Sequence, residues 1–298
     1  TDLSLRLTMK LRLFLSLIFM VTHQWVYGWG YSAHRLINRE AVQLLNSPLG
    51  EFFNSYINYI SEHAIDPDLW KKDKENHPNE YPGHFIDADL FDDYPFKKIP
   101  RKWEDVVNKY GKKKLDSWGT APWRIEEYYY QLVTQFRDGE WIKARLTATA
   151  LGHYVSDIHV PFHTCANYNG QLTGNKGVHK RWEANMVDEF LLDSMNTSGR
   201  LIGIDDPVSQ AFLIVEESFP YVGTILKAET KARETVPVHL RSTISNWEVS
   251  MIGSEYIKIL YVETGALALS RMEIASLSVA SYWHSAWVAA GKPSPPGR

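Results

Sequence analysis

The sequence predicts a single, mainly helical domain. Apolar residues recur at three- and four-residue spacing over most of the chain, which is typical of amphipathic helices. The strict apolar–polar alternation of a half-buried strand is nearly absent. No fixed-period repeat or low-complexity linker divides the chain, and an apolar content of 44% supports one sizeable core. We therefore expect an all-α fold.

The first 28 residues are expected to lie outside this domain. From Met9 onward, basic residues precede the mostly apolar run Leu13–Val21. Val26 and Gly28 are small enough for the −3 and −1 positions of a cleavage site, so the segment has the pattern of a secretory signal peptide. A membrane anchor is the alternative, but nine apolar residues are too few to span a bilayer. We expect cleavage after Gly28 and a secreted or periplasmic domain, 29–298, without a transmembrane segment.

Helices are expected wherever the apolar spacing is uninterrupted. The predicted ranges are 35–60 (two helices, broken at Ser47-Pro48), 103–110, 123–137, 141–159, 179–195, and further helices within 205–231 and 241–288. Residues 66–100 hold five prolines among many charges and are expected to be mostly loop. The Gly- and Asn-rich segment 167–177 is also expected to be a loop.

Charge and cysteine content limit the possible partners and sites. The formal net charge of −3 gives no global basic field that would favour nucleic acid binding. The lysine-rich pieces 71–74, 97–102 and 111–114 are interpreted as solvated loops. Cys165 is the single cysteine, which excludes an internal disulfide and a thiolate-rich zinc site. Any metal must therefore be held mainly by nitrogen and oxygen.

The segment 152–183 carries the strongest site signal. His153 and Asp157 are four residues apart, as are His179 and Glu183, and residues at this spacing share one face of a helix. His163 lies between the two pairs, just past the proline that ends the first helix. Imidazole with carboxylate is a ligand set of catalytic zinc. One such pair alone is more often a coincidence, but two pairs with a linking histidine favour a metal site.

Three earlier segments add candidate ligands. The segments WGYSAH, HAIDPD and YPGHFID carry Trp29, His34, Asp66, Asp68, His84 and Asp87. The order of these motifs resembles that of the superfamily of zinc-dependent phospholipases C and single-strand-specific nucleases. The order is a Trp at the mature terminus, then His, Asp, HF-x-D, H-x-x-x-D-x-x-x-x-x-H and H-x-x-x-E. The resemblance covers about Trp29–Glu183.

The resemblance implies a cluster of three zinc ions. One ion would be held by the α-amino group and carbonyl of Trp29 with His34, a second by Asp68, His84 and His153, and a third by His163, His179 and Glu183. Asp157 would bridge the first two ions, and Asp66 remains an alternative to Asp68. The implied reaction is hydrolysis of a phosphodiester by a metal-bound hydroxide. Asp87 is then either a general base or a hydrogen-bond partner of His84.

The remaining histidines are not expected to bind metal. His159 faces away from the His153–Asp157 pair and is interpreted as structural or supporting. His63 precedes the Asp66 segment and is a candidate cap for it. No stable protein partner is implied.

The branch of the superfamily, and so the substrate, stays open. Glu183 as the last ligand resembles the phospholipase branch, whereas the five-residue spacing from Trp29 to His34 resembles the nuclease branch. The nuclease branch usually carries disulfides, which the lone Cys165 cannot supply. The helical pattern after Glu183 predicts no C-terminal β-sandwich, so lipid binding would depend on the helical domain alone. We expect a phospholipase-C-like phosphodiesterase, with a single-strand nuclease or 3′-nucleotidase as the alternative. A secreted zinc-binding protein without catalytic activity is the remote alternative.

Overall fold

A computed structural model describes residues 29–236 and 254–296. The structure is 67% helical and forms no strand or sheet within these ranges, so the predicted all-α fold is confirmed. The predicted signal peptide, 1–28, and the 241–253 part of the last predicted helix lie outside the described residues. None of the described helices is long and apolar enough to cross a membrane.

The helices differ widely in length. The α-helices are α2 (Tyr31–Gln43), α3 (Leu49–Ser55), α4 (Ile57–His63), α5 (Asp66–Trp70), α6 (Ala88–Phe91), α7 (Trp103–Tyr110), α8 (Lys112–Trp118), α9 (Ala121–Arg137), α10 (Trp141–Asp157), α11 (Val178–Lys180), α12 (Val187–Phe190), α13 (Pro207–Ser218), α14 (Tyr221–Glu234) and α16 (Ser254–Ala289). Two 3₁₀ turns, η1 (Tyr81–His84) and η2 (Pro161–Thr164), and one π-helical turn, η3 (Arg181–Met186), complete the set.

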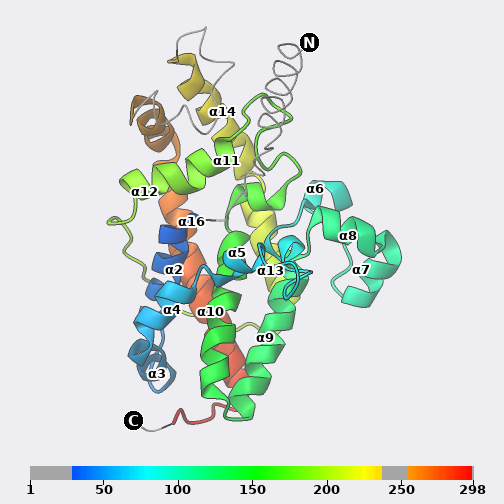
Figure 1. The fold of residues 1–298 in the computed structure, drawn as a ribbon, viewed down its shortest axis with the longest axis vertical. Helices are drawn as coiled ribbons and strands as arrows, with labels where there is room; N and C mark the ends of the chain where they lie inside the picture. The colour runs from blue at the N-terminus through cyan, green and yellow to red at the C-terminus, as the bar shows by residue number, and fades with distance from the viewer. Residues whose placement is uncertain (1–28, 237–253, 297–298) are drawn as a thin grey trace, which may run out of the picture.

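The core is built around α9, α10 and α16, which pack against one another and run along the long axis of the molecule (Figure 1). Trp283 of α16 is buried and donates its indole N–H to the carbonyl of Ala148 in α10 at 2.7 Å. Its ring stacks on Phe53 of α3 with centroids 5.2 Å apart. These contacts bury large aromatic surfaces, which dominate core energetics. The small helices α6, α7 and α8 project to one side (Figure 1).

A close approach of α2 to α10 prepares the site. Gly152 lies against Asn38, and a Cβ at this position would come within 2.3 Å of the Asn38 side-chain oxygen. Asn38 also donates its side-chain amide to the carbonyl of Thr149 at 3.0 Å. As a result His34 and His153, one on each helix, stack with ring centroids 3.9 Å apart.

Several helix boundaries differ from the predictions. The range 31–63 holds three helices, not two. The predicted solvated loop 111–114 is exposed, but Lys112–Lys114 form the first turn of helix α8. The range 66–100 is mostly loop, as predicted, but includes α5, η1 and α6. Helix α10 ends at Asp157, slightly earlier than predicted, because Val160 must be extended before a proline and has ψ 119°.

The segment predicted as one helix over 179–195 is irregular. It consists of α11, η3 and α12 and ends at Phe190. The middle turn, η3, has the wider π-helical geometry and contains Glu183. Such turns are rare in proteins, and a large share of those that occur lie at functional sites.

Candidate metal centre

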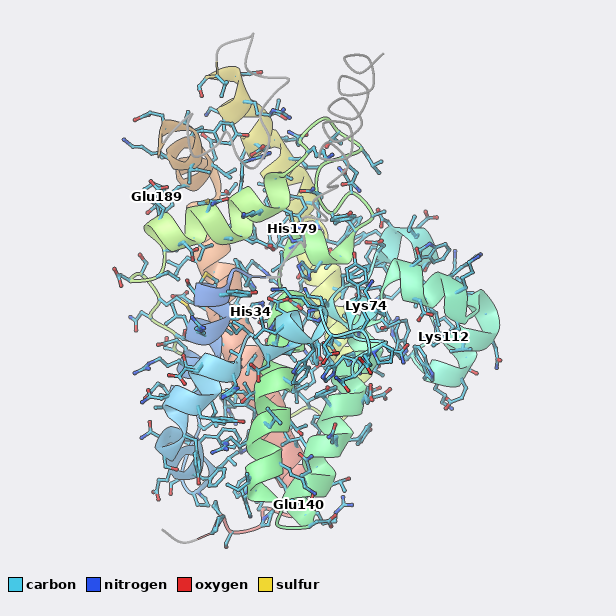
Figure 2. The ribbon with its side chains drawn as sticks, in the orientation of Figure 1. His34, Lys74, Lys112, Glu140, His179 and Glu189 are labelled. Carbon is cyan, nitrogen blue, oxygen red and sulfur yellow. The ribbon has the colours of Figure 1, made fainter. Side chains whose placement is uncertain are left out.

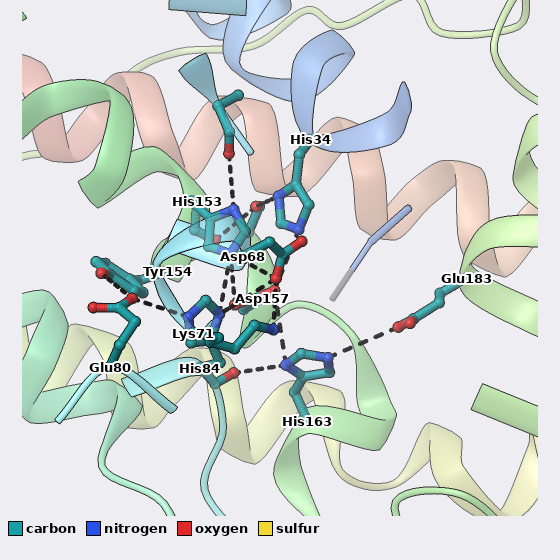
Figure 3. Close-up of polar contacts among 12 residues, drawn as sticks. His34, Asp68, Lys71, Glu80, His84, His153, Tyr154, Asp157, His163 and Glu183 are labelled. Carbon is teal, nitrogen blue, oxygen red and sulfur yellow. Dashed lines mark hydrogen bonds and ion pairs between the residues drawn. The ribbon is translucent and has the colours of Figure 1, made fainter. Parts of the chain in front are cut away.

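Three groups of buried histidines and carboxylates lie close together, and two of them share His153. Figure 3 shows most of their side chains. In each group the potential ligand atoms lie within 4.8 Å of one another. The groups are His34, Asp68 and His153; His84, His153 and Asp157; and His163, His179 and Glu183. Figure 2 shows His34 and His179 towards the middle of the molecule, with Lys112, Glu140 and Glu189 at its edges. The structure therefore brings together all eight predicted ligand side chains.

Asp157 lies at the centre of these groups. Its carboxylate oxygens lie 2.8 Å from His84 Nδ1, 3.2 Å from His153 Nε2, 3.4 Å from His34 Nε2 and 3.7 Å from His163 Nδ1. Burial favours the neutral acid, but His153 and His163 hold the pKa of Asp157 well below its usual range. One ionised carboxylate thus faces four imidazoles, the position expected of a bridging ligand.

Hydrogen bonds on the outer side orient His34 and His153. The Ser156 hydroxyl donates to the carbonyl of His153 at 2.8 Å, so its oxygen accepts from His34 Nδ1, also at 2.8 Å. His153 Nδ1 donates to the carbonyl of Ala64 at 2.8 Å. With Nδ1 protonated in both rings, Nε2 carries the free lone pair and faces the cluster.

The same arrangement recurs at His163 and His84. His163 Nδ1 donates to the carbonyl of His84 at 2.6 Å, which leaves Nε2 facing Glu183 at 3.8 Å (Figure 3).

His84 Nε2 donates to Glu80 Oε1 at 3.0 Å, and Tyr154 donates its hydroxyl to the same oxygen at 2.6 Å. His84 Nδ1 is thereby free to face Asp157. The partner of His84 is Glu80, not Asp87, and Glu80 was missed although it has the same four-residue spacing.

The donor set fits a divalent metal. His34 Nε2, Asp157 Oδ1 and His163 Nε2 are buried and have no hydrogen-bond partner among the residues that the structure describes. Such atoms are rare in proteins, because an unpaired buried polar group costs about 1–3 kcal/mol. Imidazole nitrogens with carboxylate oxygens are the ligands that zinc accepts.

The protonation equilibria of the metal-free groups agree with this fit. Burial, with His153, lowers the pKa of His34 to about 4, so the ring is neutral at pH 7 as a ligand must be. Burial, with Asp157 and Asp68, raises the pKa of Glu183 well above its usual range. A cation beside Glu183 restores the carboxylate form, so metal binding and proton release are coupled at this group.

Contacts within the segment 63–71 show which of Asp66 and Asp68 belongs to a candidate metal group. Asp66 accepts a hydrogen bond from His63 Nδ1 at 2.8 Å, whereas Asp68 belongs to a metal group. Lys71 lies 2.6 Å from Asp68 Oδ1 and is 3% exposed. The interpretation of 71–74 as a solvated loop is therefore wrong for Lys71, which was missed as a site residue.

A cleft of about 370 Å³ opens onto the groups. Lys71 lines it, together with His163 and His179. Aromatic rings form much of the rest of its wall, namely Tyr81, Phe85, Phe162 and Tyr168. A small molecule can therefore reach the buried groups.

Trp29 lies beside the third group. Its buried ring packs on Trp182 with centroids 5.3 Å apart. The next residue, Gly30, donates its N–H to the carbonyl of Glu183 at 3.4 Å and accepts from the N–H of His34 at 3.2 Å. The backbone of Trp29 thus precedes α2 within one helical turn of His34.

His159 is not part of the groups. It is buried, and its Nδ1 accepts a hydrogen bond from Arg271 at 2.8 Å. Arg271 also donates to the hydroxyl of Ser218 at 2.7 Å. These contacts join α10, α13 and α16, which is a structural role.

Asp87 also lines the cleft and is expected to make stability pH-dependent in the metal-free protein. Its Oδ1 has no hydrogen-bond partner in the described part of the chain, and burial, with Asp89, raises its pKa from 3.8 to about 7. Burying this carboxyl group therefore costs no folding free energy below its unfolded pKa. The loss of folding free energy grows as the pH rises from the unfolded pKa to the folded pKa. Above pH 7 this cost reaches at most about 4 kcal/mol.

Asp87→Asn is expected to raise the stability of chelator-treated protein much more at pH 8 than at pH 4.5, where the cost is only about 1 kcal/mol. Chemical denaturation at the two pH values measures the difference. Asp105→Asn, at an exposed position of α7, is the matched control and should change neither value by more than about 0.5 kcal/mol. Equal effects of Asp87→Asn at both pH values would contradict the raised pKa.

Comparison with known proteins does not assign a family. No protein-family model matches the chain, and no curated protein matches it. The likeness to the zinc-dependent phospholipase C and nuclease superfamily therefore rests on the order of the motifs and on the side chains that form the three groups.

Proposed function

We propose that this chain is a zinc-dependent phosphodiesterase of the phospholipase C type. One observation supports this most strongly. His34, His84, His153 and His163 each donate one ring N–H to an oxygen that is not a candidate ligand atom and turn the other nitrogen towards a carboxylate of the groups. Outer hydrogen bonds of this kind orient the imidazole ligands of metal sites.

The proposed cofactor is a set of three zinc ions. His34, Trp29 and the bridging Asp157 would hold one, Asp68, His84 and His153 another, and His163, His179 and Glu183 the third. The described groups divide the same residues differently, because His34 and Asp68 both lie near His153. Bound zinc lowers the pKa of water towards 7 and stabilises negative charge on phosphoryl oxygens.

The chain supplies the remaining functions. Lys71 lies in the cleft wall beside Asp68, where its ammonium group can hold an anionic phosphate oxygen. Asp87 lines the same cleft, and its carboxyl group can accept a proton near neutral pH, since burial raises its pKa to about 7. These two side chains bind the substrate and move a proton.

The cleft also supports a second candidate activity. Tyr81 and Phe85 meet edge to face with centroids 5.4 Å apart, and Tyr168 is a further ring of the wall. Exposed aromatic faces stack on nucleobases, which favours a single-strand nuclease or 3′-nucleotidase. Glu183 as the last ligand favours the phospholipase branch, and we retain that branch as the proposal.

Protein beginning at Trp29 is expected to bind about three zinc ions and to hydrolyse a phosphodiester. Removing the ions with a chelator should abolish turnover and lower Tm, because metal that binds only the folded state stabilises it. Elemental analysis, thermal denaturation and parallel assays on phosphatidylcholine, single-stranded DNA, RNA and 3′-nucleotides measure these effects. Three bound ions without turnover on any substrate would favour a non-catalytic zinc-binding protein, and one ion or none would contradict the cluster.

A further inference from the structure

A buried ion pair lies behind the third metal group. Arg181 in η3 and Glu229 in α14 are both fully buried. Arg181 Nε lies 3.0 Å from Glu229 Oε1, and Arg181 Nη2 donates to the same oxygen. Tyr256 of α16 donates its hydroxyl to it as well. Three segments distant in sequence thus meet at one carboxylate oxygen.

Arg181 also holds the segment that leads into α11. Its Nη2 donates to the carbonyls of Asn175 at 3.3 Å and Lys176 at 3.0 Å. Asn175 in turn donates its side-chain amide to the hydroxyl of Thr230 in α14 at 3.0 Å. The turn before His179 and the turn after it are therefore fixed to the same helix, α14.

This network is not optimised for stability. A buried ion pair seldom repays the desolvation of its two charges unless all its polar atoms are paired. Arg181 Nη1 and Glu229 Oε2 are buried without a hydrogen-bond partner within residues 29–236 and 254–296. The arrangement is better explained by what it positions.

His179 needs such positioning more than the other imidazoles. Neither of its ring nitrogens has a hydrogen-bond partner in the described ranges, whereas each of the other four rings donates to a fixed oxygen. Its Nε2 nevertheless lies 2.6 Å from Glu183 Oε2. Its orientation must come from the backbone on which it is mounted and from packing against Phe162, 5.5 Å away between centroids.

Arg181 controls that backbone. It lies two residues after His179 and two before Glu183, and residues two apart on a helix point in different directions. Its side chain therefore extends towards α14 while those of His179 and Glu183 extend towards His163. Fixing Arg181 at the junction of α11 and η3 fixes the rotation of the two turns that carry His179 and Glu183.

We propose that the network of Arg181, Glu229 and Tyr256 positions the third metal group and sets its zinc affinity. The inference rests on the proposed zinc centre. Arg181 acts through His179 and Glu183 and is a positioning residue, since it contacts no reacting group. Loss of a residue that orients metal ligands typically costs about 10- to 100-fold in affinity.

The test is zinc retention in graded concentrations of a competing chelator. Arg181→Met should lose one of the three ions at a chelator concentration at least about tenfold lower than wild type, with the other two retained. Arg181→Lys keeps the charge but not the forked donors, and should restore the affinity only in part. The double variant Arg181→Met with Glu229→Leu removes both charges and is expected to fold, and its third ion should remain weak.

Phe136→Leu is the control for general destabilisation. Phe136 is buried and packs on Phe53 and Trp141, at the opposite end of α10 from the metal groups. It should lower Tm and leave the three affinities unchanged. Wild-type affinity for the third ion in Arg181→Met and in the double variant, or equal weakening of all three ions, would overturn the inference and leave the proposed function intact. Wild-type protein that binds no zinc would overturn both.

Discussion

Asp157→Asn is expected to lower phosphodiesterase turnover by at least about 100-fold, and by more than Glu183→Gln does. Asp157 faces four imidazoles and is the one ligand side chain that contacts members of all three groups. A neutral amide at this position weakens two proposed ions at once and leaves their charge poorly compensated. Glu183 serves one ion, so its replacement should leave the other two in place.

Zinc content and turnover measured on the same preparations separate the two variants. Asp157→Asn should either bind one ion fewer than Glu183→Gln or bind its ions more weakly. Asp105→Asn is the control for loss of a carboxylate. Turnover above about one tenth of wild type in Asp157→Asn, a barrier change below roughly 1.4 kcal/mol, would refute the bridging role.

The sequence predicts the local parts of this site well. The pairs His153–Asp157 and His179–Glu183 follow from helical spacing, and both lie in the groups. The neighbourhood of His34 and Asp68 could not be derived from spacing, because those residues come from separate helices. The motif order implied one cluster for both residues but placed them on different ions, whereas the structure groups them with His153.

Features that depend on tertiary packing were missed. Lys71 belongs to a charged segment, and its burial follows from how α5 packs. The π turn at Glu183 was missed because apolar spacing does not distinguish it from an ordinary helical turn. The partner of Arg181 is Glu229, 48 residues later, and no local pattern joins them. Glu80 is different, since its spacing from His84 was visible in the sequence.

Activity is also expected to require a free α-amino group on Trp29. The structure places Gly30 against the carbonyl of Glu183 and the N–H of His34, so the backbone just before it lies beside the groups. An α-amine has a pKa near 8, and zinc can displace its proton at neutral pH. An amide nitrogen, as in an uncleaved Gly28–Trp29 bond, has no such lone pair to donate.

Protein that retains residues before Trp29 should therefore bind one zinc ion fewer and lose at least about tenfold in turnover. Scarless cleavage to Trp29 should restore both, while the same extension fused at the other end of the chain should have no effect. Mass spectrometry of the terminus, zinc analysis and one phosphodiester assay are sufficient. The ring of Trp29 is buried against Trp182 in the uncleaved chain, so a lower zinc content in the extended protein would not come from loss of this packing. Equal zinc content and equal rates in the extended and cleaved proteins would show that this amine is not a ligand.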